Sequence, residues 1–245
     1  MFPKNFDAHW AGGTDPIPVV LDGGWINSLG IVRSLAELGL KSVVIHSKPD
    51  GVGLASRYAV GLTAPSPWDD PEGLISRLVA VGQRLPRTGI LLITDDTYLM
   101  TLARGRERLA PYFRFTFPDA ETLAFMMDKQ NQYEAALRLG VPVPRSLQVR
   151  CGQTGAEWPP EAFPALVKGL SGKQFFHVFG KQTIVVKDRA ALEAVLSQCA
   201  GLDALVQELI PGGDDELYTL GCYVSPDPEK EPVVFTGRKL IQIPP

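Results

Sequence analysis

Residues 17–46 read IPVVLDGGWINSLGIVRSLAELGLKSVVIH and decide the fold of the first half of the chain. The opening IPVVLD is short, apolar and rich in β-branched residues, which is typical of a buried strand. Two glycines follow, and apolar residues then recur at helical spacing until Gly39. SVVIH predicts a second strand. Strand, glycine turn, helix and strand begin a parallel α/β layer, because a parallel pair needs a crossover that packs on the sheet.

The same pattern continues to residue 118. A proline-rich loop leads into an amphipathic helix expected at 72–85, and an apolar strand follows at 89–96. A helix at 97–109 and a short strand at 113–117 complete the region. We therefore predict a three-layer α/β domain built on a parallel sheet.

In the second half, strands no longer alternate regularly with helices, and this pattern predicts an α+β architecture. Asp119 and Asp128 are placed to cap two helices, and Pro142 and Pro144 end the second helix because they lack N–H donors. Strands are expected in FPALVKG (163–169), QTIVVKD (182–188) and ALVQELI (204–210), with a helix at 189–199 and a final antiparallel hairpin made of LYTLGCYV (217–224) and VVFTGRKLIQI (233–243).

Composition indicates a globular protein with a sizeable core. The 24 basic and 27 acidic residues are mixed along the chain and give a net charge of -3, so nothing predicts a nucleic-acid partner or a membrane surface. The first eighteen residues lack the apolar core of a signal peptide, and the cytoplasm is the expected location. Cys151, Cys199 and Cys222 are scattered, which predicts reduced and mostly buried thiols rather than disulfides or a zinc site.

Four features of the second half occur in an order that is typical of a known family. Asp128-Lys129 opens a helix, Lys168 ends a strand, a glycine-containing loop spans 169–181, and QELIPGGDDE spans 207–216. Together they resemble the ATP-grasp superfamily, in the carboxylate–amine ligase branch that includes D-aspartate ligase-like proteins and proteins similar to the large subunit of carbamoyl phosphate synthase. The resemblance extends over nearly the whole chain.

The resemblance implies three parts. Residues 1–118 would form a pre-ATP-grasp α/β domain with a three-layer parallel sheet. Residues 119–205 would form ATP-grasp subdomain A, and residues 206–245 the incomplete start of subdomain B. Both of the latter are α+β.

Two lysines match the phosphate-directed lysines of this family. A nucleotide triphosphate carries several negative charges, which lysines from separate elements can neutralise as point charges. The resemblance assigns Lys129 and Lys168 to this role. Considered alone, Lys129 is equally explained as a solvated residue in a first helical turn, and Lys168 as a strand-end lysine that extends to water.

The loop at 169–181 departs from the small-residue loop of the family. Gly172 and Lys173 could present backbone amides and a charge to a phosphate, since glycine lets a backbone approach closely. Three phenylalanines interrupt the glycines, so the loop could instead serve as a lid or as a contact with another domain. His177 within it has no identifiable partner and is expected to be structural.

The segment VQELIPG matches the adenine-binding hinge of the family. The resemblance implies that Gln207 or Glu208 faces the exocyclic amine and that backbone atoms of Leu209 and Ile210 face the ring. Successive side chains of a strand point to opposite faces, so only one of the two polar residues can enter the pocket, and the sequence leaves open which. Glu216 matches the acid that hydrogen-bonds the ribose hydroxyls, the alternative being a solvated turn residue.

Two further pairs of charged residues have weaker assignments. Arg238 and Lys239 lie on a late strand, where a cation could serve the terminal phosphate or an acyl phosphate. Asp95 and Asp96 follow an apolar strand, a position at which acids commonly cap the next helix. No catalytic residue is assigned.

A complete ligase of this family would use ATP to phosphorylate a carboxylate, giving an acyl phosphate that an amine attacks. Magnesium and lysines would stabilise the transferred phosphoryl group. The implied cofactors are therefore ATP and, in the complete protein, magnesium. The implied partners are ATP, a small-molecule carboxylate and an amine, and the resemblance is compatible with a homodimer.

The magnesium ligands of the family lie downstream of the hinge. After Glu216 this chain has only Asp227, Glu229 and Glu231, all in a proline-bounded turn, so no metal ligand is predicted. We expect the sequence to be the front part of a longer ligase, inactive alone. A non-catalytic adenine-nucleotide-binding or regulatory module is the alternative. A Rossmann-type domain is a third, although DGGWINSLG does not follow G-x-G-x-x-G.

Overall fold

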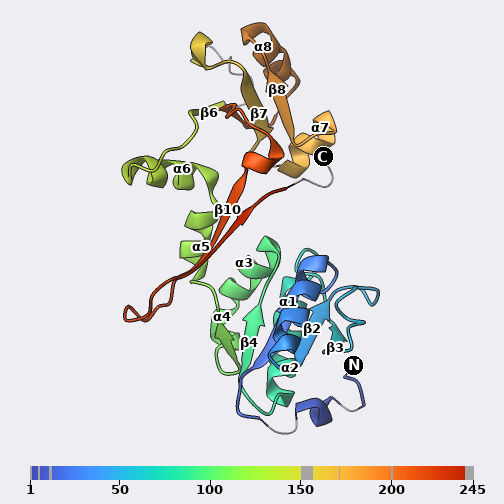
Figure 1. Ribbon diagram of the computed structural model, residues 1–245. Coiled ribbons are helices and arrows are strands. Elements are labelled where there is room, and N and C mark those ends of the chain that lie inside the picture. The colour runs from blue at the N-terminus through green and yellow to red at the C-terminus, as the bar shows by residue number, and fades with distance from the viewer. Residues whose placement is uncertain are drawn as a thin grey trace. The chain divides into compact units, whose positions relative to one another are not determined.

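The computed structural model describes residues 2–4, 6–10, 13–149, 157–170, 172–199 and 201–240 (Figure 1). Cys151 lies outside these ranges. Cys199 is buried, as predicted, whereas Cys222 is exposed. The chain forms two compact units, Met1–Gln132 and Tyr133–Pro245, which are described separately. The predicted boundaries at 118 and 205 remain proposals. None of the helices seen is long and apolar enough to cross a bilayer.

The first unit contains a five-stranded parallel sheet. Its elements are a 3-10 helix (Asp7–Trp10), β1 (Ile17–Leu21), α1 (Ile26–Glu37), β2 (Ser42–His46), β3 (Ala59–Thr63), α2 (Pro71–Arg84), β4 (Gly89–Leu92), α3 (Asp96–Arg104), α4 (Arg106–Leu109), β5 (Phe113–Phe115) and α5 (Ala120–Met127), and α6 (Lys129–Arg138) crosses into the second unit. The strand order is β3-β2-β1-β4-β5. In the central strand, Val20 pairs with Val44 of β2 and with Leu92 of β4.

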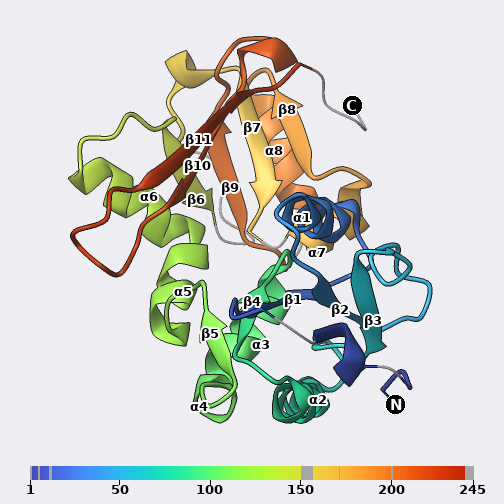
Figure 2. The ribbon, with the colours of Figure 1, turned by 60° about the horizontal axis from the view of Figure 1, so that its bottom comes forward.

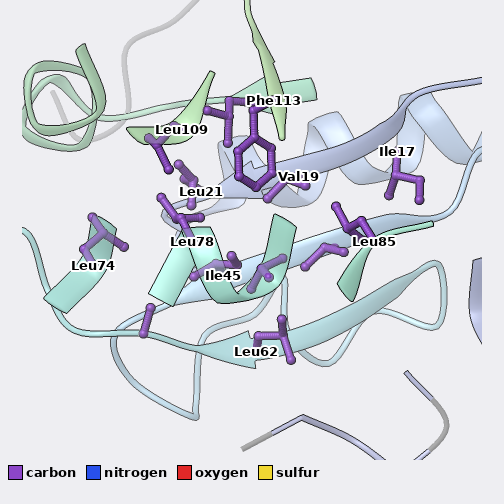
Figure 3. Close-up of a cluster of buried hydrophobic side chains, with 14 of the residues drawn as sticks. Ile17, Val19, Leu21, Ile45, Leu62, Leu74, Leu78, Leu85, Leu109 and Phe113 are labelled. Atoms are coloured by element: carbon purple, nitrogen blue, oxygen red, sulfur yellow. The ribbon is translucent and has the colours of Figure 1, made fainter. Parts of the chain in front are cut away.

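Helices cover both faces of this sheet, as the three-layer prediction requires. On one face Leu74 and Leu78 of α2 pack with Val19 and Leu21 of β1 in the larger core (Figure 3). On the other face Val32 of α1 packs against neighbouring strands in a smaller cluster. Alternate residues of the strands therefore enter two separate apolar layers, which explains the continuous hydrophobic run in β1.

β3 is a strand that the sequence pattern did not predict. It follows β2 without an intervening helix, so residues 42–63 lack the strand-helix-strand spacing by which the other parallel strands were recognised. The helix expected at 97–109 is divided into α3 and α4 at Gly105. A Cβ on Gly105 would lie 2.5 Å from Cδ1 of Ile75, so the absence of a side chain lets this bend approach α2.

A substitution at Gly61 tests the placement of β3, the strand that the sequence did not predict. A Cβ at this position would lie 2.8 Å from the carbonyl oxygen of Leu54, a backbone atom that cannot easily move away. We expect Gly61→Ala to lower the free energy of unfolding by about 1–3 kcal/mol, as overpacking does. Gly30→Ala is the matched control, because no atom lies within 4 Å of its Cβ and alanine favours the interior of α1. Equal denaturant midpoints for the two variants would contradict the placement of β3.

The second unit contains an antiparallel four-stranded sheet and a separate hairpin (Figure 2). Its elements are β6 (Ser146–Val149), a 3-10 helix (Pro160–Ala162), β7 (Ala165–Gly169), α7 (Gly172–Phe179), β8 (Thr183–Val186), α8 (Arg189–Gln198), β9 (Ala204–Glu208), a 3-10 helix (Asp214–Glu216), β10 (Tyr218–Tyr223) and β11 (Val233–Arg238). The larger sheet has the order β6-β9-β7-β8, and β10 pairs with β11 as predicted. The mixed α/β and α+β fold class is thus confirmed.

The predicted helix caps are present at the starts of α3, α5 and α6. Asp119 accepts a hydrogen bond of 2.8 Å from the N–H of Thr122, and Asp128 accepts one of 2.8 Å from the N–H of Gln130. Asp95 caps α3 by accepting a hydrogen bond of 2.8 Å from the N–H of Thr97. Each carboxylate satisfies N–H groups that a helix start leaves unpaired.

The segment expected to be a loop at 169–181 contains α7, which corrects that prediction. Phe175 and Phe179 are four residues apart and therefore lie on the same helical face, with ring centroids 4.5 Å apart. Phe175 is completely buried in the core of the unit, together with Trp158 and Val167. The four-residue spacing of the phenylalanines was the helical signal in the sequence.

Candidate functional site

Lys168 and Gln207 meet on one face of the sheet in the second unit. Nζ of Lys168 donates a hydrogen bond of 2.7 Å to Oε1 of Gln207. Nε2 of Gln207 in turn donates to Oγ of Ser146 at 2.8 Å, and that hydroxyl donates to the carbonyl oxygen of Pro144 at 3.1 Å. Both Lys168 and Gln207 are half-buried. The chain of hydrogen bonds fixes the orientation of the glutamine amide and thereby the position of the ammonium.

Strand register explains why these side chains share a face. Gln207 of β9 lies opposite Leu166 of β7, and Lys168 is two residues beyond Leu166. The intervening residue, Val167, lies in the apolar core with Val206. Lys168 and Gln207 therefore project from the face opposite to that core.

Glu208 has a different role from Gln207. Its Oε2 accepts a hydrogen bond of 3.0 Å from the N–H of Arg145, and its own N–H donates to the carbonyl oxygen of Arg145 at 2.8 Å. Both contacts hold the segment that leads into β6 against β9. Of the two residues that the sequence left open, Gln207 is the one that shares a face with Lys168. Leu209 is half-buried and Ile210 is 60% exposed.

The turn that follows β9 is closed by its own acidic residues. Oε2 of Glu216 accepts a hydrogen bond of 3.1 Å from the N–H of Gly213. Arg238 forms an ion pair of 3.0 Å with Oδ2 of Asp215 and donates from Nε to the carbonyl oxygen of that residue at 2.6 Å. Arg238 thus binds this turn, while the backbone N–H of Lys239 donates to Leu217 at 2.8 Å.

The remaining sequence-predicted residues lie on other elements than Lys168. Lys129 is an exposed residue at the start of α6 and belongs to the first unit. Gly172 is the first residue of α7, so its backbone lies in a helix start rather than in a loop. The side chain of Lys173 lies outside the described residues. His177 is exposed on α7.

Sequence reasoning missed Ser146 and Arg145, which position the two hinge residues. Their contacts bridge more than sixty positions, from residue 145 to 208 and from 146 to 207. The only local signal was the polar serine directly after the proline linker, in a strand that had not been predicted.

Known proteins share this architecture. No protein-family model matches the chain. It is 25% identical over 244 residues to a D-aspartate ligase of Enterococcus faecium (strain Aus0004), and the match covers 93% of the chain and 57% of that ligase.

Solved structures extend the likeness. An L-amino acid ligase of Bacillus licheniformis matches 85% of the chain and 47% of its own length, with a TM-score of 0.57 and 15% identity. An N5-carboxyaminoimidazole synthetase of Staphylococcus aureus complexed with ADP matches 81% and 48%, with a TM-score of 0.56 and 15% identity. The chain spans about half the length of these proteins. It therefore has the ATP-grasp fold of carboxylate–amine ligases, the family that its sequence resembles.

Proposed function

We propose that the chain binds adenine nucleotide on the face of the second unit that carries Lys168 and Gln207. The observation that carries this proposal is the hydrogen bond of 2.7 Å between them. Gln207 is neutral, so this bond orients the ammonium without cancelling its charge. A half-buried, oriented lysine attracts phosphate more strongly than a fully solvated one, because the low local dielectric strengthens the interaction.

We propose the following division of roles within this site. Lys168 contacts the phosphates, and Gln207 contacts adenine together with backbone atoms of Leu209 and Ile210; Glu208 is the alternative adenine contact. Glu216 binds the ribose. The family resemblance adds Lys129, Gly172 and Lys173 as phosphate contacts, and Arg238 and Lys239 as weaker candidates. The solved ADP complex of a structural neighbour supports nucleotide as the ligand class.

The wider activity that we propose is ATP-dependent ligation of a carboxylate to an amine through an acyl phosphate, in the cytoplasm. Names of the similar proteins support this class, since they include a D-aspartate ligase and an L-amino acid ligase. ATP and two small molecules would be the partners, and a homodimer is compatible with them. Within the chain, Lys168 would neutralise phosphate charge and Gln207 would hold its ammonium in position. We also propose that the chain is similar to the large subunit of carbamoyl phosphate synthase.

Magnesium supplies charge neutralisation between phosphates when it is bound in a site of this kind. Over the described ranges no three His, Cys, Asp or Glu side chains lie close enough to hold a metal ion. We propose no magnesium ligand among these residues.

An assay of ATP turnover distinguishes the ligase proposal from its alternative, a non-catalytic nucleotide-binding module. We expect these 245 residues to bind ATP without sustained ADP release when magnesium and a panel of amino acids are added. A coupled assay for ADP measures this directly. Carboxylate-dependent ADP release would contradict the expected inactivity of the chain alone. Turnover by a longer protein that contains the chain would favour the ligase over the module.

A further inference from the structure

The side-chain amide of Gln207 has one orientation that fits both of its neighbours. Nζ of Lys168 lies 2.7 Å from the amide, and an ammonium can only donate, so the atom that it meets must be the oxygen Oε1. The nitrogen Nε2 then faces Oγ of Ser146 at 2.8 Å. A reversed amide would set donor against donor at Lys168. This face of the sheet therefore carries an acceptor of defined direction.

Ser146 is placed to receive the amide N–H. Its hydroxyl hydrogen is directed to the carbonyl oxygen of Pro144 at 3.1 Å, which leaves a lone pair of Oγ for Nε2 of Gln207. Ser146 and Gln207 are directly paired across β6 and β9, so their contact follows from strand pairing (Figure 2). Ser146 therefore holds Gln207 through an acceptor whose direction is set by the backbone.

The backbone that carries Ser146 is fixed by the residues next to it. The N–H of Arg145 donates to Oε2 of Glu208 at 3.0 Å, and the carbonyl oxygen of Arg145 accepts from the N–H of Glu208 at 2.8 Å. Pro144 precedes this pair, and its ring restricts the backbone further. Ser146 is half-buried, so water competes less for its hydroxyl than at an exposed position. These contacts give Ser146 a defined position relative to Gln207.

Lys168 holds the same amide but has a second task in the proposed nucleotide site. Its ammonium is the proposed phosphate contact, and a bound phosphate would draw it away from Oε1 of Gln207 by charge attraction. Ser146 is uncharged and makes its contact through a strand pair, so it would keep its place when nucleotide binds. The serine is therefore the anchor that continues to orient the amide in the occupied site.

The sheet face beside Gln207 offers an apolar platform for a base. Leu166 lies opposite Gln207 on one side and opposite Val185 on the other, so the three side chains share a face. Val185 is 54% exposed and Leu166 is half-buried, which leaves apolar surface next to the oriented amide. Small-molecule sites commonly combine such a surface with a few polar groups that fix orientation. A planar base packed here would present its edge to Oε1.

The oriented oxygen distinguishes purines by the group at position 6. Oε1 of Gln207 has two lone pairs and Lys168 uses one, so the second can accept the 6-amino group of adenine. The 6-carbonyl of hypoxanthine or guanine would place two acceptors against each other, and a polar group left unpaired in a binding site is costly. An amide that turned freely would present its NH2 group instead and would lose this distinction.

We propose that Ser146 is a positioning residue, which fixes the amide of Gln207 and thereby sets the preference of the nucleotide site for a 6-amino purine. The inference rests on the proposed nucleotide-binding function. Ser146 itself makes no contact with the nucleotide in this arrangement, and its effect passes through Gln207.

Calorimetry on the whole chain with ADP and inosine diphosphate tests this role. The two nucleotides carry the same phosphates and differ only at the base edge that Gln207 would face, so the ratio of their affinities isolates base selection. We expect the wild type to prefer ADP by about tenfold to a hundredfold. Ser146→Ala should reduce this ratio by about threefold to tenfold, the range for one neutral hydrogen bond, whereas Ser146→Thr keeps the hydroxyl and should keep the ratio.

Ser197→Ala is the matched control. Ser197 is exposed on α8, the helix that packs on the core face of the sheet, and its hydroxyl also donates to a backbone carbonyl, that of Ala194 at 2.8 Å. The substitution removes the same chemical group far from Gln207, so the affinity ratio should equal that of the wild type. A fall of the ratio as large as in Ser146→Ala would overturn the inference.

A double-mutant cycle separates positioning from a general effect on the fold. In Gln207→Leu the amide is absent, so adding Ser146→Ala should leave the affinity ratio unchanged. A further fall in the double variant would mean that Ser146 acts on the base by another route and would overturn the inference. An unchanged ratio in Ser146→Ala alone, with ADP bound by the wild type, would overturn it as well. Failure of the wild type to bind ADP would instead overturn the proposed nucleotide site, and this inference with it.

Discussion

Replacing Phe175 by alanine is expected to lower the free energy of unfolding of the second unit by about 3–5 kcal/mol. Its ring is completely buried among Trp158, Val167 and other core residues, and alanine would leave a cavity in a small core. The core of this unit is formed by a single sheet face with α7 and α8, so few other residues can fill the space. Loss of this contact should also release the segment that follows Lys168.

Phe176→Ala is the matched control for this prediction. Its side chain is 53% exposed on the same helix, and we expect a loss below about 1 kcal/mol, as for most surface positions. Native-state hydrogen exchange measures the two units separately: amides of β7 and β9 should lose protection in Phe175→Ala, while those of β1 and β2 keep it. Equal destabilisation by the two substitutions would show that α7 does not pack as described.

Replacing Lys168 by methionine is expected to weaken ATP binding by about tenfold to a hundredfold, the range for a lost charge-assisted hydrogen bond to phosphate. Methionine keeps an apolar stem on the sheet face, so the substitution removes the charge with little change in packing. Gln207 would retain its hydrogen bond to Ser146. Isothermal calorimetry with a non-hydrolysable ATP analogue gives the affinity directly.

Lys187→Met controls for a general loss of positive charge. Lys187 is exposed and directly follows β8 in the same unit. We expect its replacement to change the affinity by less than about threefold, since exposed charges are screened by salt. Equal losses in the two variants would point to a diffuse electrostatic attraction rather than to a site at Lys168.

Elements with a strong local pattern were predictable from the sequence. The β1-α1-β2 unit has an apolar strand, a helical stripe and a terminating Gly39, which has φ of 75°. β3, β6 and α7 were not predicted. β3 lacks a preceding helix, β6 is stabilised by its pairing with the distant β9, and the aromatic spacing of α7 was obscured by the glycines around it.

The candidate site, too, was predictable where its features are local and not where they depend on distant pairing. Lys168 and Gln207 could be selected from the sequence because a lysine ending an apolar strand and a polar hinge are local features. Their contact depends on the register between β7 and β9, which the local sequence does not specify.

Hydrogen exchange locates the bound nucleotide on the chain and so tests whether it lies at Lys168 and Gln207. Hydrogen exchange is measured on the whole chain with and without a saturating non-hydrolysable ATP analogue. We expect protection of β7 and of residues 205–216 in the second unit, around Lys168 and Gln207. Protection confined to the β1-α1 turn of the first unit, as a Rossmann-type nucleotide site would give, would contradict it.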